Sequence, residues 1–311
     1  MSQRPYLLAL LAFALAVPLA AQQQVFRSTA DTVSVFVTAT DKSGHLITKL
    51  TKDDFQVFDN GKPQPITVFD NSPQPIRLII LIDISGSMAG NLPLLGNACV
   101  EMVSALAPND LARIGTFGTE ILISPKFTRD ARELLSFLPR SVPRNEPTPL
   151  WDAVVQGIKE FDTSGAEGRR VIMVLSDSKD TGPQKMGHAF LSPLEIIEKA
   201  NSEDVMVYGV GVRSAMPNTM GGNLMSAMES TIPDPSLGRV ADDTGGGYFE
   251  LMPRDNLQNT FAKVAEELHQ QYLLGFTPPV RDGKTHKIEV KLKTPGAKVR
   301  VRKDYVAPKS S

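Results

Sequence analysis

The sequence predicts an α/β fold in which a doubly wound, mostly parallel sheet is flanked by helices, with a small β module from the two ends of the chain. The first observation behind this prediction is an almost unbroken apolar run, IRLIILIDIS from residue 76. Such a run is typical of a central parallel strand that is buried on both faces. The second is the alternation of strand and helix patterns up to residue 271, which indicates strands joined by crossover helices.

The elements expected after the first central strand follow in chain order. Strands are expected near 111–118, 121–124, 169–176, 205–212 and 247–251. Helices are expected near 92–106, 131–138, from Pro149, near 193–200, near 235–242 and over 256–271. Two residues separate the strands at 111–118 and 121–124, too few for a crossover, so we expect this pair to be antiparallel. The Met- and Gly-rich piece at 215–228 is interpreted as a mobile loop.

Both ends of the chain alternate with period two, which is typical of strands with one buried face. In the segment 22–75 we expect VSVFVTAT, FQVF and ITVF to form short antiparallel strands, the last two joined by the turn at 59–62. After the α/β domain at 76–271, the segment 272–311 returns to strand patterns, YLLGFTP, HKIEVKLK and AKVRVRKDY. The pairing of the two β segments as one sandwich-like unit is a hypothesis.

Residues 1–21 have the layout of a cleaved secretory signal. Arg4 precedes an apolar run over 6–19, and small residues follow at 20–21. The run is shorter than the roughly 20 residues that a spanning helix needs. We therefore expect a mature chain that starts near Gln22, exported to the periplasm or released, with no membrane span after cleavage. An uncleaved membrane anchor is the alternative.

Composition excludes some classes of function. The chain has 33 Lys and Arg against 34 Asp and Glu, so bulk charge gives no reason to expect a nucleic acid or an anionic membrane as partner. Cys99 is the sole cysteine and lies in an apolar helical stretch, where we interpret it as a core filler. The four histidines are scattered without the spacing of zinc ligands. Function therefore depends on local groups.

Oxygen-bearing residues gather where the predicted strands end. Asp83, Ser85 and Ser87 follow the first central strand, Thr148 precedes a predicted helix, and Asp177 ends the strand at 169–176. Carboxyl ends of strands form the ligand crevice of such a sheet, and carboxylate and hydroxyl oxygens suit a hard cation such as Mg²⁺. Taken singly, each piece has a structural alternative: a strand-to-helix turn, a helix N-cap before Pro149 and a loop cap.

Three pieces of the sequence together resemble the von Willebrand factor A (VWA) family: the motif Asp-Ile-Ser-Gly-Ser at 83–87, the loop around Thr148 (146–152, here called the threonine loop) and Asp177. This family has a Rossmann-like fold and a metal-ion-dependent adhesion site. The resemblance implies that Ser85, Ser87 and Thr148 ligate Mg²⁺ (or Mn²⁺ or Ca²⁺) directly, while Asp83 and Asp177 act directly or through water. The C-terminal part of the chain resembles the VWA-related acidobacterial proteins through TGGGYFEL at 244–251, and the N-terminal segment resembles them through DDFQVFDNGKPQPI. The loop before Thr148 reads RNEP and Ser178 follows Asp177, two places where the family often has glycine, so the sequence of both loops departs from the family pattern.

The predicted function is a metal-dependent protein-binding module and not an enzyme. Two negative charges among five ligands leave a coordination position that an Asp or Glu of a protein partner can fill. One alternative is a structural scaffold of an envelope complex with incidental metal. A hydrolase is a weaker alternative, because Ser85 stands where aspartate-nucleophile phosphatases have a second Asp, and SGSMAG lacks Gly-x-Ser-x-Gly spacing.

Overall fold

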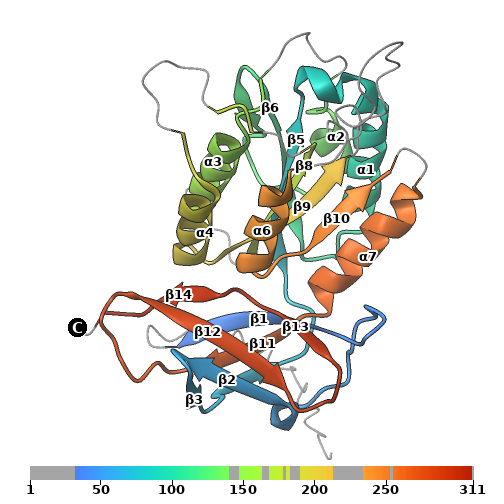
Figure 1. The fold of residues 1–311 in the computed structure, drawn as a ribbon. Helices are drawn as coiled ribbons and strands as arrows, with labels where there is room; N and C mark the ends of the chain where they lie inside the picture. The colour runs from blue at the N-terminus through green and yellow to red at the C-terminus, as the bar shows by residue number, and fades with distance from the viewer. Residues whose placement is uncertain are drawn as a thin grey trace, which may run out of the picture.

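The computed structural model describes residues 32–139, 147–162, 168–177, 180–182, 190–212, 234–252 and 255–309. The predicted secretory signal, the loop at 215–228, the RNE segment at 144–146 and Ser178 lie outside these ranges. The described chain forms an α/β unit above a β module (Figure 1). Within these ranges, no helix is both long and apolar enough to cross a bilayer.

The central sheet has six strands in the order β10-β9-β8-β5-β6-β7. Their bounds are β5 (Ile76–Asp83), β6 (Leu111–Phe117), β7 (Ile121–Ile123), β8 (Arg169–Ser176), β9 (Val205–Val212) and β10 (Tyr248–Leu251). Neighbouring strands are parallel apart from β6 and β7, which pair antiparallel. The predicted fold class is confirmed, including the antiparallel pair that the short connection required.

Helices cover both faces of this sheet (Figure 1). One face packs against α1 (Leu92–Ser104), α2 (Ala131–Leu135) and α7 (Leu257–His269). The other packs against α3 (Leu150–Asp162), α4 (Pro193–Ser202) and α6 (Pro235–Asp243). Alternate side chains of β5 enter the two cores, Ile80 and Ile82 on the first face and Ile79 and Leu81 on the second. This double burial explains the unbroken apolar run, and Cys99 is fully buried in α1.

The helix predicted over 131–138 is shorter in the structure and ends at Leu135. The amides of Phe137 and Leu138 donate to carbonyls three residues back, at Leu134 and Leu135. Such tightened bonds close the last turn of a helix and lead the chain out of it. The apolar pattern alone did not locate this end, because Phe137 and Leu138 still pack against the core.

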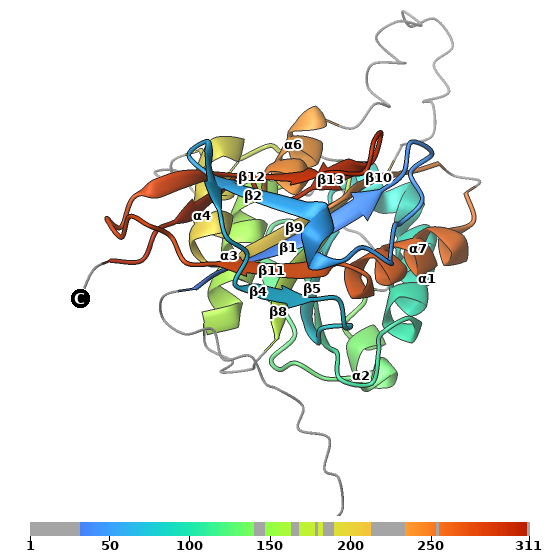
Figure 2. The same cartoon turned by 90° about the horizontal axis from the view of Figure 1, so that it is seen from below.

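The β module consists of two four-stranded sheets, ordered β13-β1-β11-β4 and β14-β12-β2-β3. Viewed from below, they form two layers (Figure 2). The first contains β1 (Val33–Thr40), β4 (Val68–Asp70), β11 (Tyr272–Phe276) and β13 (Lys298–Arg300). The second contains β2 (Phe55–Asp59), β3 (Lys62–Gln64), β12 (Thr285–Leu292) and β14 (Asp304–Val306). The 3-10 helix η1 (Lys52–Asp54) directly precedes β2. In both sheets, strands from the start and the end of the chain are hydrogen-bonded neighbours.

Two expectations about strand partners were wrong. FQVF does not pair with ITVF, because β2 pairs across the turn with β3, while β4 joins β11 in the other sheet. Asn60 and Gly61 at the turn have φ of +47° and +78°, as a two-residue hairpin turn requires, and such a turn pairs only the residues directly beside it. AKVRVRKDY, expected as one stretch, divides into β13 and β14, which belong to different sheets.

The α/β unit meets the β module at the edge of the central sheet where the parallel strands begin. Arg169, the first residue of β8, is buried there and donates to the Gln271 side chain at 2.5 Å and to the Leu268 carbonyl. Its guanidinium lies 4.8 Å from the centre of the Phe36 ring in β1. Burial lowers the pKa of Arg169 to about 10, which leaves it charged at neutral pH.

A second buried group at this boundary centres on Glu267 of α7. Its carboxylate accepts a hydrogen bond from the Tyr208 hydroxyl at 2.6 Å and forms an ion pair with Arg300 of β13. Tyr208 belongs to β9, so three elements from both units meet at one carboxylate. Buried charges need paired partners, and this group therefore fixes the β module relative to the α/β unit.

Candidate metal centre

Two of the five predicted ligands end neighbouring strands of the central sheet. Asp83 is the last residue of β5, and Asp177 directly follows β8, which pairs with β5 in parallel. The chain leaves β5 towards α1 on one face and leaves β8 towards α4 on the opposite face. Strands whose connections diverge in this way form the switch point of a doubly wound sheet, where ligands bind at the carboxyl edge.

Asp83 is fully buried and accepts two hydrogen bonds from neutral donors. The Ser85 amide donates at 2.8 Å and the Ser176 hydroxyl at 2.5 Å. Burial, with a smaller contribution from the charge of Asp177, raises the pKa of Asp83 from 3.8 to about 6, although the hydrogen bonds from Ser176 and Ser85 lower it. The carboxylate is therefore held ionised near neutral pH at a cost in folding free energy.

Ser85 and Ser87 lie on the short turn after β5. The turn continues as the 3-10 helix η2 (Gly86–Asn91), and the hydroxyl oxygens of the two serines are 3.1 Å apart. The amide of Ile84 donates to the carbonyl of Phe117 at 3.0 Å, which ties the turn to the end of β6. Ser85 is buried and Ser87 is exposed, so the pair runs from the carboxylate of Asp83 towards solvent.

Thr148 is buried and lies just ahead of α3. Its amide donates to the Thr181 hydroxyl at 2.8 Å, and its carbonyl accepts from the Thr181 amide at 3.0 Å. The first amide of α3, that of Leu150, donates to the Asp180 carboxylate at 2.9 Å. The threonine loop is therefore bonded to the loop that follows Asp177, and Asp180 takes the capping role that was the structural alternative for Thr148.

The structure thus brings the predicted residues to one sheet edge in two groups. Asp83, Ser85 and Ser87 form a hydrogen-bonded series, and Asp177 is close enough to Asp83 to perturb its pKa. Thr148 joins this edge through the loop after Asp177. That these residues ligate a metal stays a prediction.

The sequence reasoning missed three residues at this edge, Ser176, Asp180 and Thr181. All three lie in the segment SDSKDTG around Asp177. Ser176 hydrogen-bonds Asp83, and the other two hold the threonine loop. The polar character of the segment was a signal, but the partners come from loops that are distant in sequence.

The chemistry of the five groups fits a hard divalent cation. They offer two carboxylates and three hydroxyls, and oxygen is the ligand atom that Mg²⁺ and Ca²⁺ prefer. Two like charges lie near each other at a buried position, an arrangement that a cation relieves. Among the described ranges, this edge included, no three or more His, Cys, Asp or Glu side chains gather so as to hold a metal ion. A cation at the switch-point edge would therefore depend on the hydroxyl oxygens as well as on the two carboxylates.

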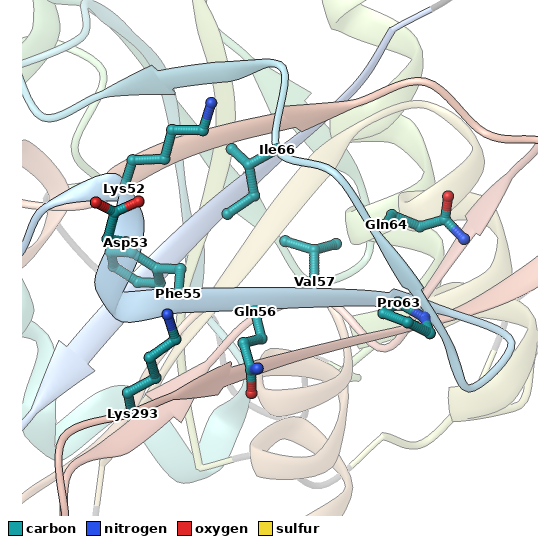
Figure 3. A pocket seen from close by; sticks show the side chains of 9 residues that line it. All are labelled: Lys52, Asp53, Phe55, Gln56, Val57, Pro63, Gln64, Ile66 and Lys293. Carbon is teal, nitrogen blue, oxygen red and sulfur yellow. The ribbon is translucent and has the colours of Figure 1, made fainter.

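A separate hollow of about 270 Å³ lies in the β module (Figure 3). Strands β2 and β3 form much of its wall, and charged or polar ends surround a small apolar floor. It lies in the module that packs against the opposite edge of the central sheet, away from the five candidate ligands. Its lining is Lys52, Asp53, Phe55, Gln56, Val57, Pro63, Gln64, Ile66 and Lys293.

Comparison with known proteins agrees with the class that this fold and edge define. The family model for the von Willebrand factor type A domain matches residues 78–238, just over half of the chain. The chain therefore belongs to the VWA family, whose domains commonly mediate protein–protein interactions. No curated protein matches the sequence.

Three solved structures illustrate the likeness in fold. BatB from Bacteroides thetaiotaomicron is 18% identical, with 62% of this chain and 97% of that chain covered and a TM-score of 0.47. A von Willebrand factor type A protein from Catenulispora acidiphila is 13% identical, with 82% and 74% covered and a TM-score of 0.49. An aerotolerance-related membrane protein from Bacteroides fragilis is 16% identical, with 62% and 98% covered and a TM-score of 0.46.

Proposed function

We propose that this chain is an exported protein-binding module that holds a divalent cation at Asp83, Ser85, Ser87, Thr148 and Asp177. Mg²⁺ is the expected ion, with Mn²⁺ or Ca²⁺ as alternatives. The partner is a protein that offers an Asp or Glu carboxylate. The observation that carries the proposal is the buried Asp83 carboxylate, joined to the Ser85 and Ser87 hydroxyls at the switch point of the sheet.

The residues at this edge have distinct parts in the proposal. Asp83 and Asp177 together bring two negative charges, enough to balance a divalent ion formally, while Ser85, Ser87 and Thr148 add neutral oxygens. When bound, the ion supplies a coordination position that accepts an external carboxylate. Because Ser87 is exposed while its neighbour Ser85 is buried, the partner carboxylate can approach the site from the side of Ser87. Charge pairing is strongest where the protein excludes water.

Titration calorimetry with Mn²⁺ tests the metal site. We expect one site in the wild type and no binding in Asp83→Asn, which removes one of the two charges. Asp110→Asn is the matched control, because Asp110 is also buried but lies just before β6, at the opposite edge of the sheet. It should retain the Mn²⁺ heats once they are normalised to the folded fraction. Equal heats from the wild type and Asp83→Asn would overturn the site.

Partner binding needs its own experiment. A pull-down from envelope extract with and without EDTA identifies ion-dependent partners, and binding is then measured for Ser85→Ala and Thr148→Ala. Both substitutions remove a hydroxyl without changing charge, so they should weaken binding far more than they lower the free energy of unfolding. Capture that survives EDTA and both substitutions favours the scaffold alternative, in which the β module or the loop near Met220 carries recognition.

Export is the remaining part of the proposal. The order of Arg4, the apolar run and the small residues at 20–21 supports cleavage near Ala21. Mass spectrometry of the protein recovered from the cell envelope or the medium should show a chain that begins near Gln22. An intact Met1 terminus on that protein contradicts the cleaved signal.

A further inference from the structure

Two loops that are distant in sequence are bonded to each other at the carboxyl edge of the central sheet. The Thr148 amide donates to the Thr181 hydroxyl at 2.8 Å, and the Thr181 amide donates to the Thr148 carbonyl at 3.0 Å. Both backbone groups of Thr148 are thus engaged by one residue. A reciprocal pair of this kind fixes the backbone position from which the Thr148 side chain extends.

Asp180 adds a second tie between the same loops. Its carboxylate accepts from the Leu150 amide at 2.9 Å and also from the amides of Trp151 and Gly182. Leu150 and Trp151 open α3, and a carboxylate at a helix N-terminus satisfies amides that lack partners within the helix. Asp180 therefore holds the start of α3 against the loop that follows Asp177. Thr148, just ahead of α3, is held against the same loop.

We propose that Asp180 and Thr181 are positioning residues, which set the place of Thr148 relative to Asp177 and Asp83. The inference rests on the proposed function, because Thr148 acts there as an ion ligand. Asp177 lies on the same loop as Asp180, so the ties join two of the ligand-bearing segments into one unit. Residues that orient ligands in this way typically change metal affinity by about 10–100-fold when they are substituted.

A double-substitution cycle separates positioning from a general effect on the fold. Mn²⁺ affinity is measured by calorimetry for the wild type, Thr181→Val, Thr148→Ala and the double variant. We expect Thr181→Val to weaken Mn²⁺ binding by about 10–100-fold in the wild-type background. In the Thr148→Ala background it should have little further effect, because the ligand it positions is gone. The same fold-loss in both backgrounds overturns the proposal.

Thr181→Ser supplies an independent decision if Thr148→Ala binds too weakly to measure. Serine restores the hydroxyl that accepts from the Thr148 amide, so it should recover most of the Mn²⁺ affinity that Thr181→Val loses. A loss in Thr181→Ser as large as that in Thr181→Val overturns the proposal. A wild type that binds no Mn²⁺ fails the proposed function itself, which is a different result.

Asp180→Ala tests the second tie, with Asp130→Ala as the matched control. Asp130 caps α2 through the amides of Arg132 and Glu133, so both substitutions remove an aspartate cap from a helix. Asp180→Ala should weaken Mn²⁺ binding by at least about 10-fold, while Asp130→Ala leaves it unchanged. Unfolding in EDTA reports the stability lost in each variant. Unchanged Mn²⁺ affinity in Asp180→Ala overturns its role as a positioning residue.

Discussion

Asp83→Asn should stabilise the metal-free protein at pH 7.5 while it abolishes metal binding. The substitution removes a charge that is fully buried and has a charged neighbour in Asp177. It also preserves the hydrogen bonds, since the carboxamide oxygen of the new side chain replaces the acceptor of the Ser85 amide. The Ser176 hydroxyl, which now donates at 2.5 Å, can turn to accept from the new amide group.

The magnitude follows from the raised pKa of Asp83. A rise from 3.8 to about 6 corresponds to about 3 kcal/mol, because each pKa unit is worth about 1.4 kcal/mol. Since the folded-state pKa is the higher one, the folded state disfavours the ionised form. The cost is absent below pH 3.8, grows up to pH 6 and is complete above it. Asparagine does not titrate, so the gain in stability has the same pH dependence.

Thermal unfolding in EDTA at several pH values tests this reasoning. At pH 7.5 we expect a rise in Tm of roughly 6–10 °C for Asp83→Asn, and almost none at pH 3.5. Asp110→Asn should instead lower the Tm at pH 7.5. Burial alone raises the pKa of Asp110, but hydrogen bonds from His269 and the amides of Ile76 and Ala107 outweigh it and lower the pKa. An Asp83→Asn variant less stable than the wild type at pH 7.5, or equally stabilised at both pH values, refutes the argument.

Two further predictions concern parts of the molecule away from the candidate metal centre. Glu267→Gln should lower the free energy of unfolding in urea by about 3 kcal/mol, because it leaves the partly buried Arg300 without its charged partner. Glu266→Gln, at an exposed neighbouring residue, should change the free energy of unfolding by less than about 0.5 kcal/mol. Equal losses in the two variants would contradict the stabilising role of the Glu267–Arg300 pair. Burial raises the pKa of the Cys99 thiol to about 12. A disulfide reagent such as DTNB should therefore react with Cys99 only after the protein unfolds. Rapid reaction of the native protein would contradict this prediction.

The sequence predicted the central sheet well because its signals are local. The apolar run of β5 and the alternation of strands and helices suffice to define a doubly wound sheet. The short connection before β7 also forced an antiparallel pair. Strand partners in the β module were harder to predict. Alternation shows which face of β1 is buried, but its partner β11 comes from the other end of the chain, and period-two patterns carry no information about partners.

The candidate site was also predictable only where its signals are local in the sequence. Each predicted ligand follows a strand or opens a helix, so its place at the carboxyl edge could be inferred from the order of elements. The roles of Asp180 and Thr181 could not, because they depend on hydrogen bonds to Thr148 and Leu150 more than 25 residues away in sequence. The pKa of Asp83 likewise depends on burial by several elements, which no short motif encodes.

The two edges of the central sheet have different surroundings, and this difference bears on partner access. The β module packs where the parallel strands begin, around Arg169 and Glu267. Asp83 and Asp177 lie where those strands end. Both connections between the units, β4 to β5 and α7 to β11, enter at the first edge (Figure 1). A partner that approaches the ends of β5 and β8 therefore need not displace the β module, and the paired charges that fix that module can stay intact during binding.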